Sequence, residues 1–298
     1  EANLFENLEA LQSLLKKGEA PAVPKDAWTL VPKSITPNEV ESELISSEPE
    51  YLWSEVLRAA KSGKNKTKSK KPEAKFRIME ALPVEFHVFA ALWIQKVGHK
   101  FEAKLTDAAC GNRLRRKKPK KDGEIGKLNP LSLGSTVPSL YPYCKWRDDG
   151  IRAMHDALDA DKKVVAITAD VSSFYHELDV SFMLKPEFLD RIEVRLTKDE
   201  QVLHNLFIRS LQAWAVETPL KKGLPVGLSA SGVIANVALF ELDKMMKEEV
   251  APLYYGRYVD DIILVMENGA DFKSSIEVWE WLKARSDGAL ILKGTAAN

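Results

Sequence analysis

The sequence predicts an α+β fold, in which long helical segments accompany a few short strands. Residues 164–169 form an apolar run typical of a buried strand, and residues 253–266 hold two β-forming runs on either side of a tight acidic bend. Helices are predicted over residues 198–216 and from about 229 to 249. With 298 residues, the chain can bury about three quarters of its unfolded surface, which allows a sizeable core.

The first 75 residues are predicted to be helices separated by loops. Leucines recur on one face between residues 3 and 17, which indicates a helix. Four prolines between residues 21 and 37 then predict a loop. Thr36 is a typical N-cap for a second helix, with proline at its first helical position. A third helix is expected over residues 48–61, and a lysine-rich loop over residues 61–75.

The middle of the chain is more apolar. Residues 76–79 predict a short strand, and residues 83–105 predict one helix or a pair of helices. The inward side chains of that helical segment are expected to be Phe86, Phe89, Ala90, Trp93 and Val97. These aromatic residues also suit a base-stacking platform, although this spacing is more typical of a core. A loop is predicted over residues 119–139 and ordered structure over residues 141–158. A C-terminal helix is predicted at about 279–282 and a last strand at 290–293.

Charge and cysteine content give no whole-chain sign of nucleic-acid binding and no cysteine metal site. The formal net charge is zero, so the whole-chain charge gives no sign of nucleic acid. Residues 61–71 hold six lysines in eleven positions, which favours a solvated loop. Residues 113–121 hold seven basic residues in nine, where phosphate contact and solvation are both open. Cys110 and Cys144 are the only cysteines and have no metal-type spacing, which fits a reducing cytoplasm.

The sequence gives no sign of membrane insertion or secretion. The longest apolar run, residues 88–94, is too short to span a bilayer. No basic segment followed by an apolar core marks a secretory signal at the start. Because the chain begins at Glu1 and not at Met, we expect that the natural N-terminus has been removed.

Three aspartates are the strongest chemical signal. Asp170 ends an apolar strand, and Asp260 and Asp261 lie at the bend of the predicted hairpin. An Asp-Asp pair alone is typical of a solvated turn. Here, however, strongly apolar β-branched residues flank the pair, and an uncompensated charge pair is costly in such surroundings. Three carboxylates at strand ends can hold two divalent cations for phosphoryl or nucleotidyl transfer.

Three motifs, in their order along the chain, resemble the three palm motifs of reverse transcriptases. The motifs are Asp170 followed five residues later by Tyr175, then residues 223–231, then Tyr258-Val259-Asp260-Asp261. The resemblance covers roughly residues 75–266 and is strongest to the bacterial abortive-infection and defence-associated enzymes, more than to retron or group II intron enzymes. In the family the middle motif usually reads Pro-Gln-Gly, but Val226 replaces the glutamine, and Gly232 stands where a proline usually follows the serine. The loss of this polar contact puts ordinary template-directed fidelity in doubt.

The resemblance implies a right-hand polymerase with fingers and palm, in which a ferredoxin-like palm sheet is accompanied by helices. The implied domains are an N-terminal extension with its basic loop (residues 1–75), the fingers (residues 76–163) and the palm (residues 164–298). The palm would contain a helical insertion near residues 180–222. No primer grip or thumb is evident after the hairpin, so we expect the chain to be a fragment of a longer protein.

The resemblance also implies roles for the aspartates. Asp170 and Asp260 would bridge two Mg²⁺ ions, with Mn²⁺ as the alternative cation, and Asp261 would support them. The backbone carbonyl of Val171 would complete one metal shell. Tyr175 would lie beneath the sugar and exclude a ribose 2′-hydroxyl, which favours deoxynucleotides. The alternative for Tyr175 is a core tyrosine, although Phe174 is the better candidate for the core.

Other residues are candidates for nucleotide binding. Val226 and Gly227, with Ser231, lie at a turn and a helix start, where backbone N–H groups suit phosphates. An ordinary turn and N-cap is the alternative. A triphosphate also needs cations to stabilise the charge on its leaving group. The candidates are Arg113, Arg77, Lys145 and Arg147, each also typical of a surface ion pair, and Lys293 is a candidate general acid.

Together these features predict an RNA-directed DNA polymerase that transfers dNTPs to a primer or protein hydroxyl in antiphage defence, with relaxed or absent template dependence. The expected partners are an RNA or DNA template and primer, a noncoding RNA or protein primer, and an oligomer or partner subunit, with no membrane. The alternatives are a non-catalytic palm scaffold in a larger defence assembly and a templated enzyme of the retron or group II type. An RNA polymerase is a further alternative, which Tyr175 opposes.

Overall fold

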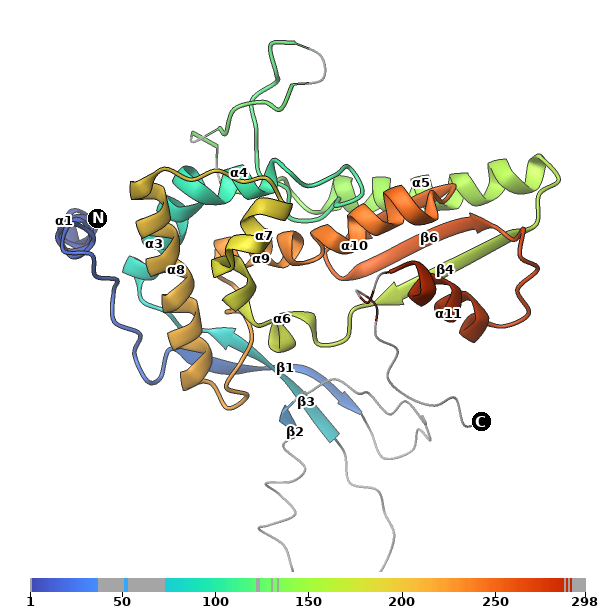
Figure 1. Cartoon of the computed structure of the whole chain (residues 1–298). Helices are drawn as coiled ribbons and strands as arrows, with labels where there is room; N and C mark the ends of the chain where they lie inside the picture. Colours follow the sequence, from blue (N-terminus) through green and yellow to red (C-terminus); the bar gives the residue numbers. More distant parts are fainter. Residues whose placement is uncertain are drawn as a thin grey trace, which may run out of the picture. The chain divides into compact units, whose positions relative to one another are not determined.

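The computed structural model describes residues 2–36, 51–52, 73–121, 124–129, 131–132, 134–286, 288 and 290 (Figure 1). The chain forms two compact units. Unit 1 comprises residues 1–93, 172–189 and 196–231, and unit 2 comprises residues 94–171, 190–195 and 232–298. Each unit therefore gathers segments that are far apart in the sequence. The division into extension, fingers and palm stays a prediction.

Unit 1 contains an antiparallel sheet in the order β1–β3–β2, with β1 at Trp28–Thr36, β2 at Tyr51–Leu52 and β3 at Glu73–Glu80. The loop predicted for residues 21–37 is wrong over Trp28–Thr36, which form a strand, and the second helix predicted after Thr36 lies outside the described residues. Pro32 misled the prediction. It lies where the register of edge strand β1 shifts, a position at which a missing N–H is tolerated.

The other predictions for the N-terminal part have mixed outcomes. The helix predicted over residues 3–17 is confirmed as α1, Ala2–Lys16. The strand predicted at residues 76–79 is confirmed within the longer β3. The helix predicted over residues 48–61 is wrong at Tyr51 and Leu52, which pair with β3. The rest of that segment, and the predicted lysine-rich loop up to residue 72, lie outside the described residues. The loop prediction is wrong at residues 73–75, which begin β3 and pair with β1.

The helices of unit 1 form an aromatic core. The main ones are α3, Val84–Trp93, and α8, Lys198–Glu217, and the shorter ones are α6, Phe174–Glu177, and η2, Val180–Leu184. The predicted inward residues of α3 are confirmed, since Phe86, Phe89, Ala90 and Trp93 have no exposed surface. Helix α8 begins with a capping box, in which Thr197 and Glu200 each accept a hydrogen bond from the other's backbone N–H. Helix α7, Pro186–Arg191, begins in unit 1.

Two predicted helices are interrupted by irregular turns. The segment predicted over residues 83–105 continues beyond α3 as a π-helical turn, η1, Ile94–Gly98, and as α4, His99–Glu102. Val97 is fully buried, as predicted. The helix predicted over residues 229–249 is divided into α9, Ser229–Ala238, α10, Phe240–Met245, and η3, Met246–Val250.

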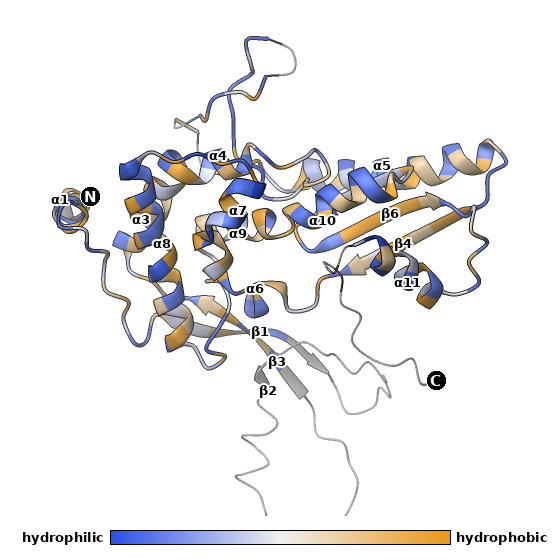
Figure 2. Cartoon of the chain, viewed as in Figure 1, coloured by the Kyte–Doolittle hydropathy of each residue, from blue (hydrophilic) through white to orange (hydrophobic). Residues whose placement is uncertain are grey.

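Unit 2 is built around a second antiparallel sheet, in the order β4–β6–β5. Its strands are β4, Val164–Asp170, β5, Tyr254–Tyr258, and β6, Asp261–Glu267. Figure 1 shows β4 and β6 side by side. Figure 2 shows apolar colour along β4 and β6. The predicted strand and hairpin are therefore confirmed, and with the helices they confirm the α+β class.

Helices cover both faces of the second sheet. On one face Ile263 and Val265 pack with Trp146 of α5, Leu140–Asp159. On the other face Leu264 and Met266 pack with residues of α10, η3 and α11, Ser275–Arg285. This alternation follows from the two-residue period of a strand. Helices α5 and α11 confirm the order predicted at 141–158 and 279–282. Leu290 lies in no strand, and residues 291–298 are outside the described ranges.

The loop predicted over residues 119–139 is irregular where it is described, and an isolated bridge joins Arg116 to Leu128. Across the described ranges, no helix has both the length and the apolar character needed to cross a bilayer.

Candidate active site

The acidic hairpin of unit 2 has a two-residue turn. Tyr258 ends β5 opposite Asp261, which begins β6, so only Val259 and Asp260 lie in the turn. The φ angle of Val259 is 63°, in the left-handed region that a β-branched residue rarely adopts. Such a conformation costs about 1–3 kcal/mol and persists only where the surrounding structure holds it in place. The turn is therefore a strained element next to two carboxylates.

The end of β4 lies beside this hairpin. Asp170 is directly opposite Asp261 on the neighbouring antiparallel strand. Directly opposite residues have Cβ atoms about 4.5–5.5 Å apart and point to the same face of the sheet. The N–H of Val171 donates to the carbonyl oxygen of Asp260 at 3.1 Å. The structure therefore brings Asp170, Val171, Asp260 and Asp261 together at one end of the sheet.

The electrostatics of this end favour a bound cation. Two like charges on directly opposite positions destabilise a strand pair. Partial burial also raises the pKa of the Asp261 carboxyl, because desolvation disfavours its charged form. Both effects oppose the ionised state in the protein alone, and a divalent cation would relieve both.

The donor set fits Mg²⁺. Within the described ranges, no group of three or more His, Cys, Asp or Glu side chains is close enough together to hold a metal ion. Mg²⁺, however, usually takes one or two carboxylates, with waters and substrate phosphates as its other ligands. The opposed pair Asp170 and Asp261, with Asp260 next to it in the turn, supplies hard oxygen atoms of this kind.

The middle motif lies in unit 1 and is held by β3. The N–H of Glu80 donates to the carbonyl oxygen of Val226 at 3.0 Å, and Met79 forms a parallel bridge with Val226. Gly227 has a φ of 111°, and a Cβ at this position would lie 3.2 Å from Oε1 of Glu80. Only glycine therefore fits the turn without a shift. The hydroxyl of Ser231 donates to the carbonyl of Pro225 at 2.8 Å.

Tyr175 also lies in unit 1, in helix α6. Its carbonyl oxygen accepts from the N–H of Leu224 at 2.6 Å, which links α6 to the middle motif. Phe174 is buried, whereas Tyr175 is only partly buried. The prediction that Phe174 is the core residue is confirmed. Both residues lie in a helix, so their difference in burial does not come from the alternating faces of a strand. A role for Tyr175, Val226 or Gly227 at the nucleotide stays a prediction.

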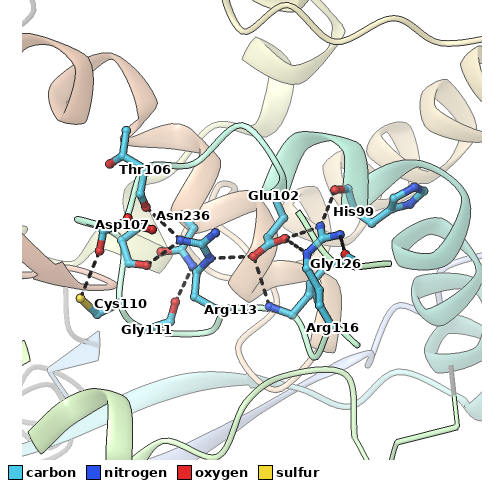
Figure 3. Close-up of polar contacts among 12 residues, drawn as sticks. His99, Glu102, Thr106, Asp107, Cys110, Gly111, Arg113, Arg116, Gly126 and Asn236 are labelled. Atoms are coloured by element: carbon cyan, nitrogen blue, oxygen red, sulfur yellow. Dashed lines mark hydrogen bonds and ion pairs between the residues drawn. The ribbon is translucent and has the colours of Figure 1, made fainter. Parts of the chain in front are cut away.

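Arg113 is part of an internal ion-pair cluster in unit 2 (Figure 3). Its Nε donates to the carboxylate of Glu102 at 2.6 Å, and its Nη1 donates to the carbonyls of Thr106 and Ala109 at 2.9 and 3.1 Å. Arg116 binds the other carboxylate oxygen of Glu102 through Nε, at 3.0 Å, and Nη2. The side chain of Glu102 is only 1% exposed. These contacts support a structural role for both arginines. Nucleotide binding by Arg113 stays a prediction.

The remaining predicted cations have different surroundings. Lys145 and Arg147 pair with the neighbouring Asp149 and Asp148 on α5. Arg77 is exposed on β3, and Lys293 lies outside the described residues. From the second basic run, Lys117, Lys118, Lys120 and Lys121 are exposed and Arg116 is held by Glu102. Phosphate contact from this run would therefore come from its lysines.

Sequence reasoning missed the buried charged groups of unit 2, among them Glu102 and Arg257. Glu102 follows Phe101 in an apolar helical segment, and a carboxylate in such a place needs a cation. That signal could have identified Arg113 and Arg116 as its partners. Arg257 lies two residues before Val259 and has no exposed surface. An arginine inside an apolar hairpin strand is the corresponding signal there.

An antiparallel sheet with helices on both faces and aspartates at adjacent strand ends is the arrangement expected of a nucleotide-transferring polymerase. Residues 69–286 match the family described as reverse transcriptase (RNA-dependent DNA polymerase). The chain belongs to this family and is an RNA-directed DNA polymerase, a nucleotidyltransferase with a right-hand polymerase fold. Nucleotides and a nucleic-acid template and primer are therefore its substrates. No curated protein matches the chain.

Proposed function

We propose that this enzyme adds deoxynucleotides to a primer or protein hydroxyl at the end of the β4–β6–β5 sheet. The observation that supports this site is the register that sets Asp170 directly opposite Asp261, with Asp260 in the adjoining turn. Asp170 and Asp260 would hold the cations, with Asp261 and the Val171 carbonyl in support. Bound Mg²⁺ would orient the triphosphate and stabilise the charge that develops during transfer.

The protein's own part in this proposal is positioning. The N–H of Val171 fixes the backbone of Asp260, and strand pairing fixes Asp170 against Asp261. The ring of Tyr175 would exclude a ribose 2′-hydroxyl, so the enzyme would favour dNTPs. The hydroxyl that attacks the α-phosphate would displace pyrophosphate in line.

We further propose relaxed or absent template dependence and a role in bacterial antiphage defence. Val226 supports the first, since an aliphatic side chain discriminates only by shape. The departures at Val226 and Gly232 from the usual middle motif support the second. The two cysteines are unpaired, which suits a reducing cytoplasm. A noncoding RNA, a protein primer or a further subunit would then be a partner of the enzyme.

The test is incubation with each labelled dNTP and NTP, with and without an added template, followed by sequencing of the product and a test for protein attachment. Asp260→Ala with Asp261→Ala is the matched inactive control. Incorporation of dNTPs that this control lacks supports the site. Equal incorporation by the control would show that the carboxylates do not serve catalysis, and a folded protein without incorporation under any condition would support the scaffold alternative.

A further inference from the structure

The guanidinium of Arg257 is a fully buried charge two residues before the strained turn. Its side chain has no exposed surface, and arginine is almost never fully buried unless it is paired. It lies in β5, next in the sequence to Tyr258. The proposed reaction does not require this charge, so its contacts must explain why it is there.

Asp243 of α10 neutralises the charge. Nε and Nη2 of Arg257 donate to the two carboxylate oxygens of Asp243, each at 2.7 Å, which is the bidentate geometry that arginine favours. The side chain of Asp243 is 1% exposed. It also accepts from the hydroxyl of Tyr255 at 2.8 Å, and the pKa of Tyr255 is raised by burial and by this carboxylate. The pair is therefore desolvated and satisfied by hydrogen bonds.

The other donors of Arg257 extend toward the turn. Nη1 donates to Oδ1 of Asn236 at 2.8 Å, and Nη2 donates to the backbone carbonyl of Asn236 at 2.7 Å. Nη1 also donates to the carbonyl oxygen of Val259 at 3.2 Å. The guanidinium thus connects α9 and α10 to the residue whose φ angle is positive.

Val259 has a second close neighbour, Gly111. Gly111 lies so close that a Cβ built on it would be 2.8 Å from Cγ2 of Val259 and 3.0 Å from its backbone nitrogen. The carbonyl of Gly111 accepts from Nδ2 of Asn236 at 2.7 Å, the contact drawn in Figure 3. Asn236 therefore joins both contacts, and together they keep Val259 in a conformation that it would not adopt alone.

We propose that Arg257 is a positioning residue for catalysis, which acts with Asp243 and Asn236 by holding Val259 in its left-handed conformation. The backbone direction at Val259 sets the path of the turn, and so acts together with the Val171 contact and the strand pairing in placing Asp260 and Asp261. The arrangement thereby sets the cation site in place before the cation binds. This inference rests on the proposed role of these two aspartates as cation ligands.

The prediction that separates positioning from general stability concerns glycine at position 259. Glycine adopts positive φ without cost, so Val259→Gly removes the need to hold the turn. Arg257→Lys keeps the charge opposite Asp243 but loses the fork that reaches Asn236 and Val259. It should therefore impair cation binding strongly with valine at position 259 and much less with glycine. If Arg257 only stabilised the fold through its ion pair, Arg257→Lys would weaken cation binding equally with valine and with glycine at position 259.

The experiment uses the full chain, with two readouts against MgCl₂ concentration: the rise in unfolding temperature and the rate of dNTP incorporation. For Arg257→Lys we expect the half-saturating Mg²⁺ concentration to rise about 10- to 100-fold, as for other residues that orient metal ligands. Asn236→Ser, which leaves the bidentate pair intact, should shift it in the same direction. The matched control is Arg116→Lys, which alters an arginine–carboxylate contact with Glu102 but none of the hydrogen bonds described for Val259 or Asn236, and which should leave the cation response unchanged.

The outcomes distinguish this inference from the function on which it rests. If Asp261→Ala keeps the full cation response, the proposed cation site is wrong, and the positioning role is wrong with it. If Asp261→Ala loses the response while Arg257→Lys and Asn236→Ser keep it, only the positioning role is overturned. An equal loss from Arg257→Lys with valine and with glycine at position 259 would also overturn it. If Arg257→Lys does not fold, Asn236→Ser decides by the same criteria.

Discussion

Asp170 and Asp261 occupy directly opposite positions on β4 and β6, at the last pair of the strand register. Two carboxylates in this relation repel each other, and like charges directly opposite in a sheet cost about 0.2–1 kcal/mol. Replacing one of them should therefore stabilise the metal-free protein. Asp170→Asn is expected to raise the free energy of unfolding by about 0.5 kcal/mol without Mg²⁺, measured by denaturant unfolding.

The Asp170→Asn variant should no longer be stabilised by Mg²⁺. Mg²⁺ should raise the unfolding temperature of the natural protein and leave that of Asp170→Asn nearly unchanged, because a ligand stabilises only the state that binds it. Asp179→Asn, at an exposed helix start in unit 1, is the control. A full Mg²⁺ response in Asp170→Asn would exclude Asp170 as a ligand.

The choice of sugar should depend on the ring of Tyr175. Tyr175→Ala is expected to lower the ratio of dNTP to NTP incorporation by about tenfold or more, because the volume that would exclude the 2′-hydroxyl is gone. Tyr175→Phe keeps the ring and should keep the ratio. The measurement is kcat/KM for matched dNTP and NTP pairs. An unchanged ratio in the alanine variant would leave Tyr175 as a packing residue of α6.

Template dependence should respond to position 226. Val226→Gln restores a polar side chain where the family usually has one, and we expect products with less biased composition on a supplied heteropolymer. Val226→Ile, which stays aliphatic, should behave like the natural protein. Product sequencing with and without template gives the comparison. Faithful copying of the template by the natural protein would refute the idea that Val226 relaxes pairing.

Stability should depend on pH through His204. This side chain is buried, accepts from Nε1 of Trp93 at 3.2 Å and bonds the carbonyl of Met183 through Nε2 at 2.8 Å. Burial lowers its pKa below the ordinary value of 6.5, so the unfolded chain binds a proton that the folded chain does not. Stability should therefore fall as the pH drops below about 6.5, by up to about 1.4 kcal/mol per pH unit.

His204→Gln offers a matched comparison, because an amide can still accept from Trp93 and donate to Met183. The free energy of unfolding of the natural protein minus that of the variant should decrease between pH 6.5 and pH 5. Equal slopes for both proteins in this window would mean that His204 takes up a proton in the folded state.

The Glu102 cluster should matter for folding more than for chemistry. Glu102→Gln removes a buried charge from two arginines, and breaking such a pair costs about 3 kcal/mol or more. Glu193→Gln, which loses only the exposed contact with Lys104, should cost less than about 1 kcal/mol. Denaturant midpoints give both numbers. Equal costs would mean that Glu102 is no better desolvated than a surface carboxylate.

The parts of the fold that could be predicted are those with a strong local signal. The apolar run of β4 and the acidic bend between β5 and β6 mark strand ends without tertiary information, and so locate Asp170, Asp260 and Asp261. Strand β1 was missed because prolines suggest loops, whereas tolerance of Pro32 depends on its place at an edge and beside a register shift. That place is set by β3, more than forty residues away along the chain.

The surroundings of the site could not be predicted for a similar reason. Nothing near Val259 in the sequence indicates a positive φ, because it is imposed by Gly111 and Arg257. Arg113 lies in a basic run, and its contacts inside the fold appear only when Glu102 is brought beside it by the turn after α4. Long-range partners determine which charged residues remain available to a ligand.

The loop at residues 108–110 has a further effect on strand β5. Arg257 donates its N–H to the carbonyl of Ala108 at 2.7 Å, and its carbonyl accepts from the N–H of Cys110 at 2.8 Å. The outward main-chain groups of β5 are thus occupied at this residue, so an extended segment from another molecule could not add there as a further strand. Edge-to-edge aggregation through the β4–β6–β5 sheet is therefore disfavoured at this residue, which leaves β4 as the more open edge strand. Asp170 ends that strand, so a parallel pairing of two β4 strands would bring their carboxylates to the same end of the sheet, where they would repel each other.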